Sequence, residues 1–223
     1  MKEIGHIFLT WREGEGKRRH IVGVLKRNAT LGVRFSYLPK GVEEAKKNGF
    51  SPYTEFPDIN REYTENVLEV FGQRIMKSER SDIRDFYDFW EIDIKYKDDK
   101  YYLLAHTQGL NPTDNFEFLA DYNPSKNLRF LTELASLSKL KLPAGTIKAN
   151  DELTYKLEPD NEFDSKAVKV FKGDQSVGYI KKVHSYVFHK QKGSHLKLIV
   201  KAVEQNGYVK RVFVKVFVSN SPR

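Results

Sequence analysis

Cysteine is absent from this 223-residue sequence. Without thiols there is no disulfide, no thiolate nucleophile and no cysteine-ligated zinc or iron–sulfur site. The six histidines do not replace them, because His184 and His189 lack the i, i+4 spacing of a helical metal pair. We therefore expect no metal ion and no other cofactor.

Long hydrophobic runs are missing as well. No apolar stretch approaches the roughly 18 residues that are needed to span a bilayer. Residues 1–9 are too short and too interrupted for a signal peptide. Hydrophobic residues make up 39% of the chain and charged residues 30%, which is ordinary for a folded protein. We expect a soluble, cytoplasmic protein without a membrane partner.

Positive charge is unevenly distributed. Residues 1–124 contain 19 Lys and Arg against 21 Asp and Glu. Residues 125–223 contain 19 Lys and Arg against 9 Asp and Glu, so the net charge of +8 arises entirely in the second half. This asymmetry favours a polyanionic partner, although a solvated basic surface without a partner has the same composition.

Residues 1–124 combine helix and strand patterns and predict an α+β domain of unknown role that ends near Asn123-Pro124-Ser125. The predicted strands are residues 5–11, 20–26, 32–38 and 116–122, with a further hairpin in residues 92–105. The predicted helices are residues 42–47, 63–76 and 82–90. Ser81 or Asp82 can cap the last of these helices.

Residues 125–223 form a second predicted domain, which is mostly β after a short helix at residues 127–137. Its predicted strands are residues 152–157, 167–171, 175–180, 196–204 and 208–218, with a helical turn at residues 183–189. The last two strands flank Asn206-Gly207, a dipeptide typical of two-residue hairpin turns in which both residues have positive φ. This turn predicts that Val203 faces Lys210.

Two segments of the second half carry a recognisable signature. Residues 157–170 read LEPDNEFDSKAVKV, and residues 177–182 read VGYIKK. Together they resemble the HIRAN domain, whose pattern is an acidic-Pro-x-Asn-x-aromatic-Asp stretch followed by Val-Gly-Tyr or Val-Gly-His. The resemblance covers about residues 130–218 and implies a small OB-like or SH3-like β-barrel with one or two short helices.

The same residues have a structural explanation that is independent of the family. Pro159 prevents a central strand from continuing, and Asn161 can hydrogen-bond to the backbone of its own turn. Gly178 permits a close approach of another backbone in an otherwise β segment. These three residues are therefore compatible with a purely structural loop.

The resemblance implies recognition of DNA. In HIRAN domains of the helicase-like transcription factor family, a barrel pocket accepts the 3′ end of single-stranded DNA. The aspartate that binds the terminal 3′-hydroxyl matches Asp164, and the aromatic residue that packs on the terminal base matches Phe163. Tyr179 matches the residue after the Val-Gly pair, and Lys182 matches a lysine that contacts phosphate. A carboxylate accepts a hydrogen bond from a hydroxyl and repels a terminal phosphate.

The opening strand departs from the family pattern. HIRAN domains carry stacking tyrosines there, before a Thr-Gly or similar pair, whereas the matching residues 141–145 read KLPAG. Lys141 and Leu142 are the candidate contacts at this place, and Leu142 and Pro143 stand where tyrosines are expected. The departure predicts end binding that is weaker, altered in specificity or lost.

Basic residues crowd the C-terminal part of the chain. They are Lys181, Lys182, Lys190, Lys192, Lys197, Lys201, Lys210, Arg211 and Lys215. Phosphate contacts of this kind dominate affinity for DNA and make it fall steeply with salt. Tyr186, Phe188 and Tyr208 are interleaved with them and are candidates for either stacking or the core.

Three functions follow as alternatives. The first is a non-enzymatic DNA-binding protein whose N-terminal domain adds a partner interface or widens the groove. The second is a protein-interaction module, such as an antitoxin-like partner or a phage-defence component, because residues 35–38 and the later helices faintly resemble the N-terminal subdomain of HipA-type kinases. The third is a small nuclease that uses Asp82, Asp85 and Asp88. No phosphate loop, nucleophile elbow or metal motif accompanies these aspartates, so we expect no enzyme.

Overall fold

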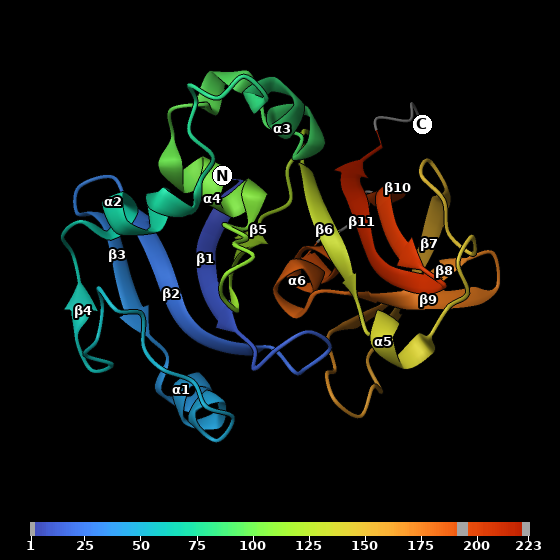
Figure 1. The fold of residues 1–223 in the computed structure, drawn as a ribbon, viewed down its shortest axis with the longest axis horizontal. Coiled ribbons are helices and arrows are strands. Elements are labelled where there is room, and N and C mark those ends of the chain that lie inside the picture. Colours follow the sequence, from blue (N-terminus) through green and yellow to red (C-terminus); the bar gives the residue numbers. More distant parts are fainter. Residues whose placement is uncertain (1–2, 191–195, 220–223) are drawn as a thin grey trace. The chain divides into compact units, whose positions relative to one another are not determined.

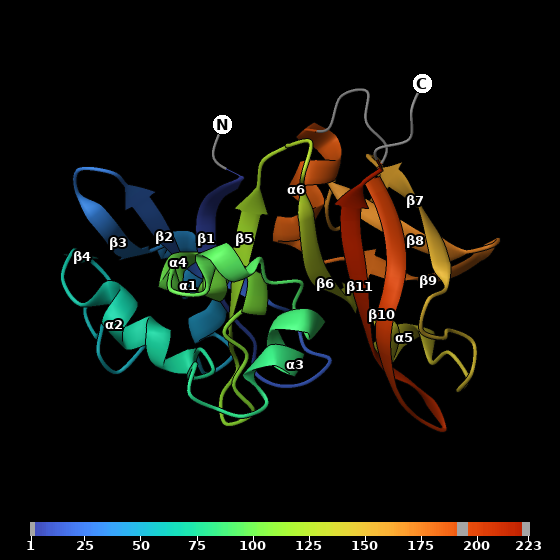
Figure 2. The same ribbon diagram turned by 90° about the horizontal axis from the view of Figure 1, so that it is seen from above.

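The computed structural model describes residues 3–190 and 196–219, and the chain divides into two compact units (Figures 1 and 2). One unit contains residues 4–121. The other contains residues 122–223 together with residues 1–3. The first unit combines helices with strands, whereas strands dominate the second, in agreement with the predicted fold class.

The first unit is built on a five-stranded sheet in the order β4-β3-β2-β1-β5. Its strands are β1 (Ile4–Trp11), β2 (His20–Asn28), β3 (Gly32–Tyr37), β4 (Glu62–Tyr63) and β5 (Phe116–Tyr122). Its helical segments are α1 (Pro39–Lys46), α2 (Val67–Phe71), η1 (Gly72–Arg74), α3 (Ile83–Phe89), η2 (Ile94–Tyr96) and α4 (Lys100–Thr107). The predicted hairpin of β1 and β2, the third strand and the strand at residues 116–122 are confirmed.

The core of the first unit is aromatic. The ring centroid of Phe35 lies 5.2 Å from that of Phe71, and that of Phe56 lies 5.0 Å from Phe71. All three side chains are buried. Arg74 lies beside this core and forms a bidentate pair, in which its Nη1 and Nη2 donate to the two carboxylate oxygens of Asp114 at 2.6 and 2.8 Å. These packed rings form the centre of the first unit.

The predicted hairpin at residues 92–105 is wrong. This segment forms η2 and α4, and the supposed turn is a helix start at which the carboxylate of Asp99 accepts a hydrogen bond from the Tyr102 amide at 3.1 Å. Every residue from Tyr101 to Thr107 is buried. A helix that is apolar all round has no 3.6-residue period, so its sequence cannot be told from a pair of strands.

Two helix predictions also need correction at their ends. The helix predicted at residues 63–76 is shortened to α2 and η1, because Tyr63 belongs to β4 and Asn66 adopts a positive φ of 54° before the helix. The helix predicted at residues 82–90 exists as α3, but the Asp82 side chain makes no capping hydrogen bond. It accepts instead from Arg80 Nε at 2.8 Å.

The second unit is a closed antiparallel barrel in the order β10-β11-β6-β9-β8-β7. Its strands are β6 (Arg129–Ala135), β7 (Glu152–Glu158), β8 (Ala167–Lys172), β9 (Gln175–Ile180), β10 (Leu196–Asn206) and β11 (Tyr208–Val218). Two short helices, α5 (Leu137–Leu140) and α6 (Lys182–Lys190), complete it. The small barrel with one or two short helices is confirmed.

The helix predicted at residues 127–137 is wrong, because residues 129–135 form β6. This strand is buried at five consecutive positions and pairs with β11 on one side and β9 on the other. The buried stretch from Phe130 to Leu134 contains Thr132 and Glu133 among its apolar residues, so the strand shows no alternation of apolar and polar side chains. Period alone therefore could not distinguish it from a helix.

The hairpin of β10 and β11 is confirmed, but its predicted register is wrong. Val203 faces Val212, and Asn206 pairs directly with Tyr208 around Gly207, whose φ is +69°. Only the glycine of the Asn-Gly pair has a positive φ. Residues 142–145 hydrogen-bond onto this turn, for example from the Ala144 amide to the Gly207 carbonyl at 3.1 Å. This non-local pairing changes the turn that the dipeptide alone favours.

Candidate nucleic-acid interface

The loop between β7 and β8 is organised by the side chain of Asn161. Its Oδ1 accepts hydrogen bonds from the amides of Phe163 at 3.0 Å and Asp164 at 3.1 Å. Its Nδ2 donates to Glu158 Oε2 at 3.0 Å. The turn predicted for Asn161 is therefore present, and it turns Phe163 outward, where the side chain is 82% exposed.

The carboxylate of Asp164 has two different surroundings. Its Oδ1 accepts a hydrogen bond from the Lys166 amide at 3.0 Å, so one oxygen braces the loop. Its Oδ2 lies 4.0 Å from the ammonium nitrogen of Lys182, at the start of α6. The Asp164 side chain is 22% exposed and that of Lys182 is 55% exposed. One carboxylate oxygen therefore faces a cation at the surface.

Glu158 joins the loop to the neighbouring strands. Besides Asn161 it binds Lys169 Nζ at 2.9 Å and accepts a hydrogen bond from the Tyr179 hydroxyl at 3.1 Å. The hydrogen bond from Asn161, followed by that from Lys169, lowers the pKa of Glu158. Sequence reasoning treated Glu158 only as the acidic start of the motif. The structure shows that it positions Tyr179, which is half-buried on β9.

Two further lysines lie beside the loop, and sequence reasoning did not single them out. Lys139 Nζ, from α5, lies 5.7 Å from the ring centroid of Phe163. Lys166 Nζ lies 5.0 Å from the ring centroid of Tyr186 on α6. Lys139 is distant from the motif in the sequence, and no local signal connects it with Phe163.

Two residues that were predicted to contact DNA, Leu142 and Lys181, are buried. Leu142 is 5% exposed, and its carbonyl accepts a hydrogen bond from the Val209 amide at 2.8 Å, so its side chain cannot pack on a base. Lys181 is 3% exposed and forms an ion pair with Glu133 at 3.1 Å, so it cannot reach a phosphate. Lys141 is exposed and has a positive φ of 47° after α5. It remains available as a contact.

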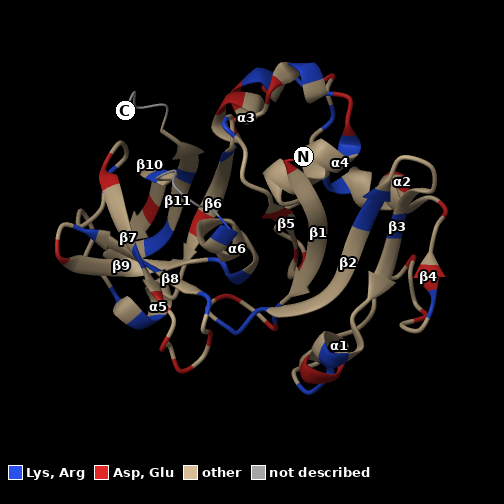
Figure 3. Ribbon diagram, turned by 180° about the vertical axis from the view of Figure 1, so that it is seen from behind, with Lys and Arg blue, Asp and Glu red and all other residues tan. Residues whose placement is uncertain are grey.

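The remaining basic and aromatic candidates differ in placement. Phe188 is a core residue, 5% exposed and 4.8 Å from Tyr155 between ring centroids, whereas Tyr208 is 48% exposed. Figure 3 shows Lys and Arg positions on α6 and on the strands of the barrel. Lys192 lies outside the described residues. Lys190, Lys197 and Lys210 are exposed, so exposed basic residues lie on α6, β10 and β11 as well as beside the loop, and Tyr208 is an exposed aromatic residue on β11.

Glu133 is the centre of a buried charge cluster under this surface. Its Oε2 pairs with Lys181, and its Oε1 accepts from Arg211 Nε at 2.7 Å, while its side chain is 10% exposed. Burial alone would raise the pKa of Glu133, but the charges of Lys181 and Arg211 outweigh burial and lower the pKa to about 2. The cluster ties β6 to the end of β9 and to β11.

The contribution of Glu133 to stability is expected to depend on pH. A carboxylate whose pKa is depressed on folding stabilises the fold fully above its ordinary pKa of 4.5 and progressively less toward about 2. The difference in unfolding free energy between wild type and Glu133→Gln should therefore shrink from about pH 6 to about pH 3. Urea unfolding at each pH measures it. A difference that stays constant across this range would contradict the ionised pairing.

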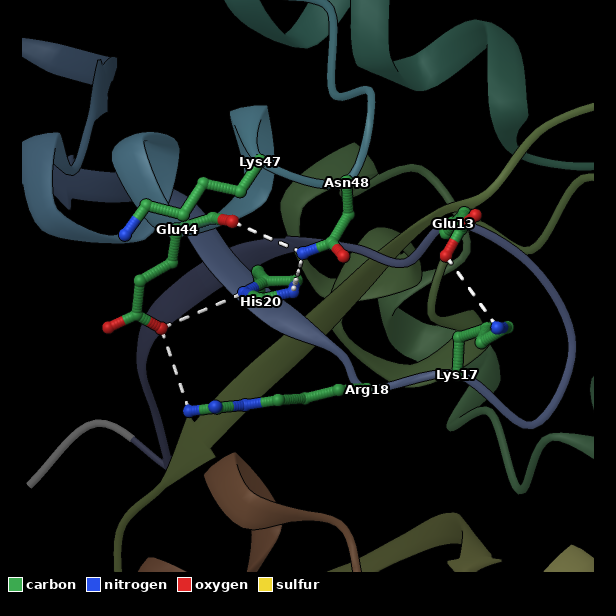
Figure 4. A pocket seen from close by; sticks show the side chains of 7 residues that line it. All are labelled: Glu13, Lys17, Arg18, His20, Glu44, Lys47 and Asn48. Carbon is green, nitrogen blue, oxygen red and sulfur yellow. Dashed lines mark hydrogen bonds and ion pairs between the residues drawn. The ribbon is translucent and has the colours of Figure 1, made fainter.

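The first unit contains a pocket of about 450 Å³ whose lining carries both signs of charge (Figure 4). Glu44 Oε2 lies 3.5 Å from Arg18 Nη2 and 3.7 Å from Nδ1 of the buried His20. Burial lowers the pKa of His20, so the imidazole is neutral near pH 7. Asn48 Nδ2 lies 3.4 Å from His20 Nε2. Glu44 thus pairs with Arg18 and lies beside neutral His20, and the lining combines Lys17, Arg18 and Lys47 with Glu13 and Glu44.

Two other properties of the described residues bear on the alternatives. Within residues 3–190 and 196–219, no group of three or more His, Asp or Glu side chains is placed to hold a metal ion. No helix in the same ranges has both the length and the apolar character needed to cross a membrane.

The barrel and the loop of residues 157–170 define a small antiparallel β-barrel domain of the kind that the sequence signature implied. The sequence model of the HIRAN domain family matches residues 128–219. The second unit is therefore a HIRAN domain. This family match supports nucleic-acid binding in general for the unit.

Comparison with solved structures finds two similar chains. One is the HIRAN domain of human HLTF, with 18% identity and a TM-score of 0.32, covering 41% of this chain and 77% of that chain. The other is a protein from Lactobacillus plantarum, with 17% identity and a TM-score of 0.33, covering 42% of this chain and 95% of that chain. A search of curated proteins finds no match. The fainter resemblance of residues 1–124 to HipA-type kinases is not shown by these comparisons.

Proposed function

We propose that this protein binds single-stranded DNA at a 3′ end through its HIRAN domain and catalyses no reaction. The observation that carries the proposal is the exposed ring of Phe163, held outward beside a carboxylate and two lysines. We call Lys139, Phe163, Asp164, Tyr179 and Lys182 the end-binding surface. The Phe163 side chain is 82% exposed, and the backbone of its loop is held by three hydrogen bonds of Asn161, so most of the ring is accessible to a base.

The chemistry of the end-binding surface suits a free 3′-hydroxyl. The terminal base stacks on Phe163, which tolerates any base because every base has a π face. The 3′-hydroxyl donates a hydrogen bond to Asp164 Oδ2, the oxygen that is not used by the Lys166 amide. Lys182 and Lys139 attract the adjacent phosphates. A 3′-phosphate would bring a second negative charge against Asp164, and binding would weaken.

Asp164→Asn is expected to abolish the preference for a free 3′-hydroxyl. Asparagine keeps an oxygen for the Lys166 amide and removes the charge that repels a 3′-phosphate, so the loop stays intact. We expect wild type to prefer the hydroxyl end about tenfold, equivalent to about 1.4 kcal/mol, and the variant to bind both ends equally. Fluorescence anisotropy with a labelled strand of about 15 nucleotides, ending in either group, measures both affinities at two salt concentrations.

Two companion variants make the Asp164 result specific. Glu162→Gln removes the same charge from an exposed position of the same loop, and it should raise affinity for both ends alike. Lys182→Gln should weaken binding to both ends. It should also reduce the slope of log affinity against log salt concentration by about one, because one phosphate contact is lost. If Asp164→Asn behaves as Glu162→Gln does, Asp164 does not read the end. If wild type binds no strand at low salt, the proposed function is wrong.

The second candidate function is a protein interface on the first unit. It is favoured by apolar side chains that this unit leaves at its surface: Leu31 is 58% exposed, Ile94 62% and Tyr96 41%. Scattered exposed apolar residues also occur on ordinary surfaces, so this observation is weaker than the end-binding surface. A pull-down with nuclease-treated extract distinguishes the two functions, because a stoichiometric partner then persists without DNA.

A further inference from the structure

The barrel exposes two aromatic side chains that each have a lysine beside the ring. Phe163 is 82% exposed and Tyr208 is 48% exposed. Lys139 Nζ lies 5.7 Å from the ring centroid of Phe163, and Lys210 Nζ lies 6.0 Å from that of Tyr208. Proteins that bind single strands combine exposed aromatic rings with basic side chains, because each ring stacks on a base and each ammonium group contacts a phosphate.

One stretch of chain connects these two rings, and we call residues 137–145 the connecting segment. It begins with α5, which packs against β9 and β11 and carries Lys139. It then pairs with the turn of the last hairpin, where Pro143 forms a β-bridge with Tyr208. Figures 1 and 2 show α5 next to that turn. The two aromatic and lysine pairs therefore lie at the two ends of one continuous segment.

The connecting segment is held rigidly and is basic at its middle. The Val209 amide donates to the Leu142 carbonyl at 2.8 Å, and the Gly145 amide donates to Gln205 Oε1 at 2.9 Å. Lys141 is exposed between α5 and these contacts. The buried side chain of Leu142 anchors the segment to the barrel, and this holds the backbone of the neighbouring, exposed Lys141 in place.

We propose that Tyr208, with Lys141 and Lys210, is a second contact site for the same DNA strand, which rests on the function proposed above. The strand leaves the end-binding surface at Phe163, follows the connecting segment and stacks a further base on Tyr208. Lys141 and Lys210 contact the phosphates between the two stacked bases. The HIRAN domain then reads an end at Phe163 and gains affinity from strand length at Tyr208.

Tyr208→Ala is expected to remove only the additional affinity that a longer strand has over a shorter one. Labelled oligothymidines of about 3 and about 12 nucleotides with a 3′-hydroxyl are the probes, used with the full chain. The variant should bind the longer strand about tenfold more weakly than wild type and the shorter strand equally well. Its preference for hydroxyl over phosphate should be unchanged. Tyr208→Phe keeps the ring and should bind both lengths as wild type does.

The first unit offers a matched control. Tyr96 is 41% exposed and has Lys95 Nζ 4.8 Å from its ring centroid, so Tyr96→Ala removes a similar pair elsewhere. It should change neither affinity. Equal binding of the longer strand by Tyr208→Ala and wild type overturns the inference and leaves the proposed function standing. An equal loss for both lengths also overturns it, because Tyr208 would then act through the fold or the end-binding surface. Absence of binding by wild type overturns the proposed function itself.

Discussion

Glu133→Gln is expected to lower the free energy of unfolding of the barrel by about 3–5 kcal/mol, because it removes one partner of a buried ion pair. The amide removes the negative charge that Glu133 places against the ammonium of Lys181, whose side chain is 2% exposed. Arg211 loses the same carboxylate. Breaking a buried network of charges is among the largest single causes of destabilisation.

Urea unfolding followed by far-ultraviolet circular dichroism measures this loss. Tryptophan fluorescence is unsuitable, because Trp11 and Trp90 both belong to the first unit. Glu204→Gln is the matched control: Glu204 also pairs with Arg211, at 3.3 Å, but its side chain is 55% exposed. An exposed pair contributes roughly 0–1 kcal/mol. Similar losses for the two variants would show that burial of Glu133 does not matter.

Gly178→Ala is expected to destabilise the barrel by more than the roughly 1–3 kcal/mol that an unfavourable backbone conformation costs by itself. Gly178 has a φ of +138°, which residues with a Cβ rarely adopt. A Cβ at this position would also lie 2.9 Å from the carbonyl oxygen of Ala135 on β6. The backbones of β6 and β9 must therefore separate, and Tyr179 moves with β9.

Gly173→Ala separates these two effects. Gly173 has a φ of +57° in the turn between β8 and β9, and nothing lies within 4 Å of a Cβ placed there. This variant should cost about 1 kcal/mol, the penalty of the left-handed conformation alone. Thermal unfolding by circular dichroism compares the two, and anisotropy with DNA should show weakened binding only for Gly178→Ala. Equal costs would falsify the role assigned to the contact with Ala135.

The motif loop was predictable from sequence because its interactions are local. Asn161 binds the amides of Phe163 and Asp164 two and three residues away, and such turns depend on residue type more than on the rest of the fold. The glycine of the last hairpin likewise adopts the positive φ that its position implies. Strands β7, β8 and β9 were also predicted to within one residue of their observed bounds.

Elements without an alternating pattern were not predictable. Strand β6 and helix α4 are buried over most of their length, so neither shows the periodic pattern of a half-buried element. The register of the last hairpin also escaped prediction, because residues 142–145 bind its turn from a distant part of the chain.

The sequence alone therefore determined the chemistry of the candidate site: an exposed aromatic, a carboxylate and basic residues in a turn held by its own side chains. Only the tertiary structure decided which basic residues reach the surface. Lys181 and Lys182 are adjacent in sequence, yet one pairs with buried Glu133 and the other faces Asp164. Leu142 is buried while Lys139 reaches Phe163. Burial and non-local pairing depend on chain closure into a barrel, and no local pattern of residues encodes them.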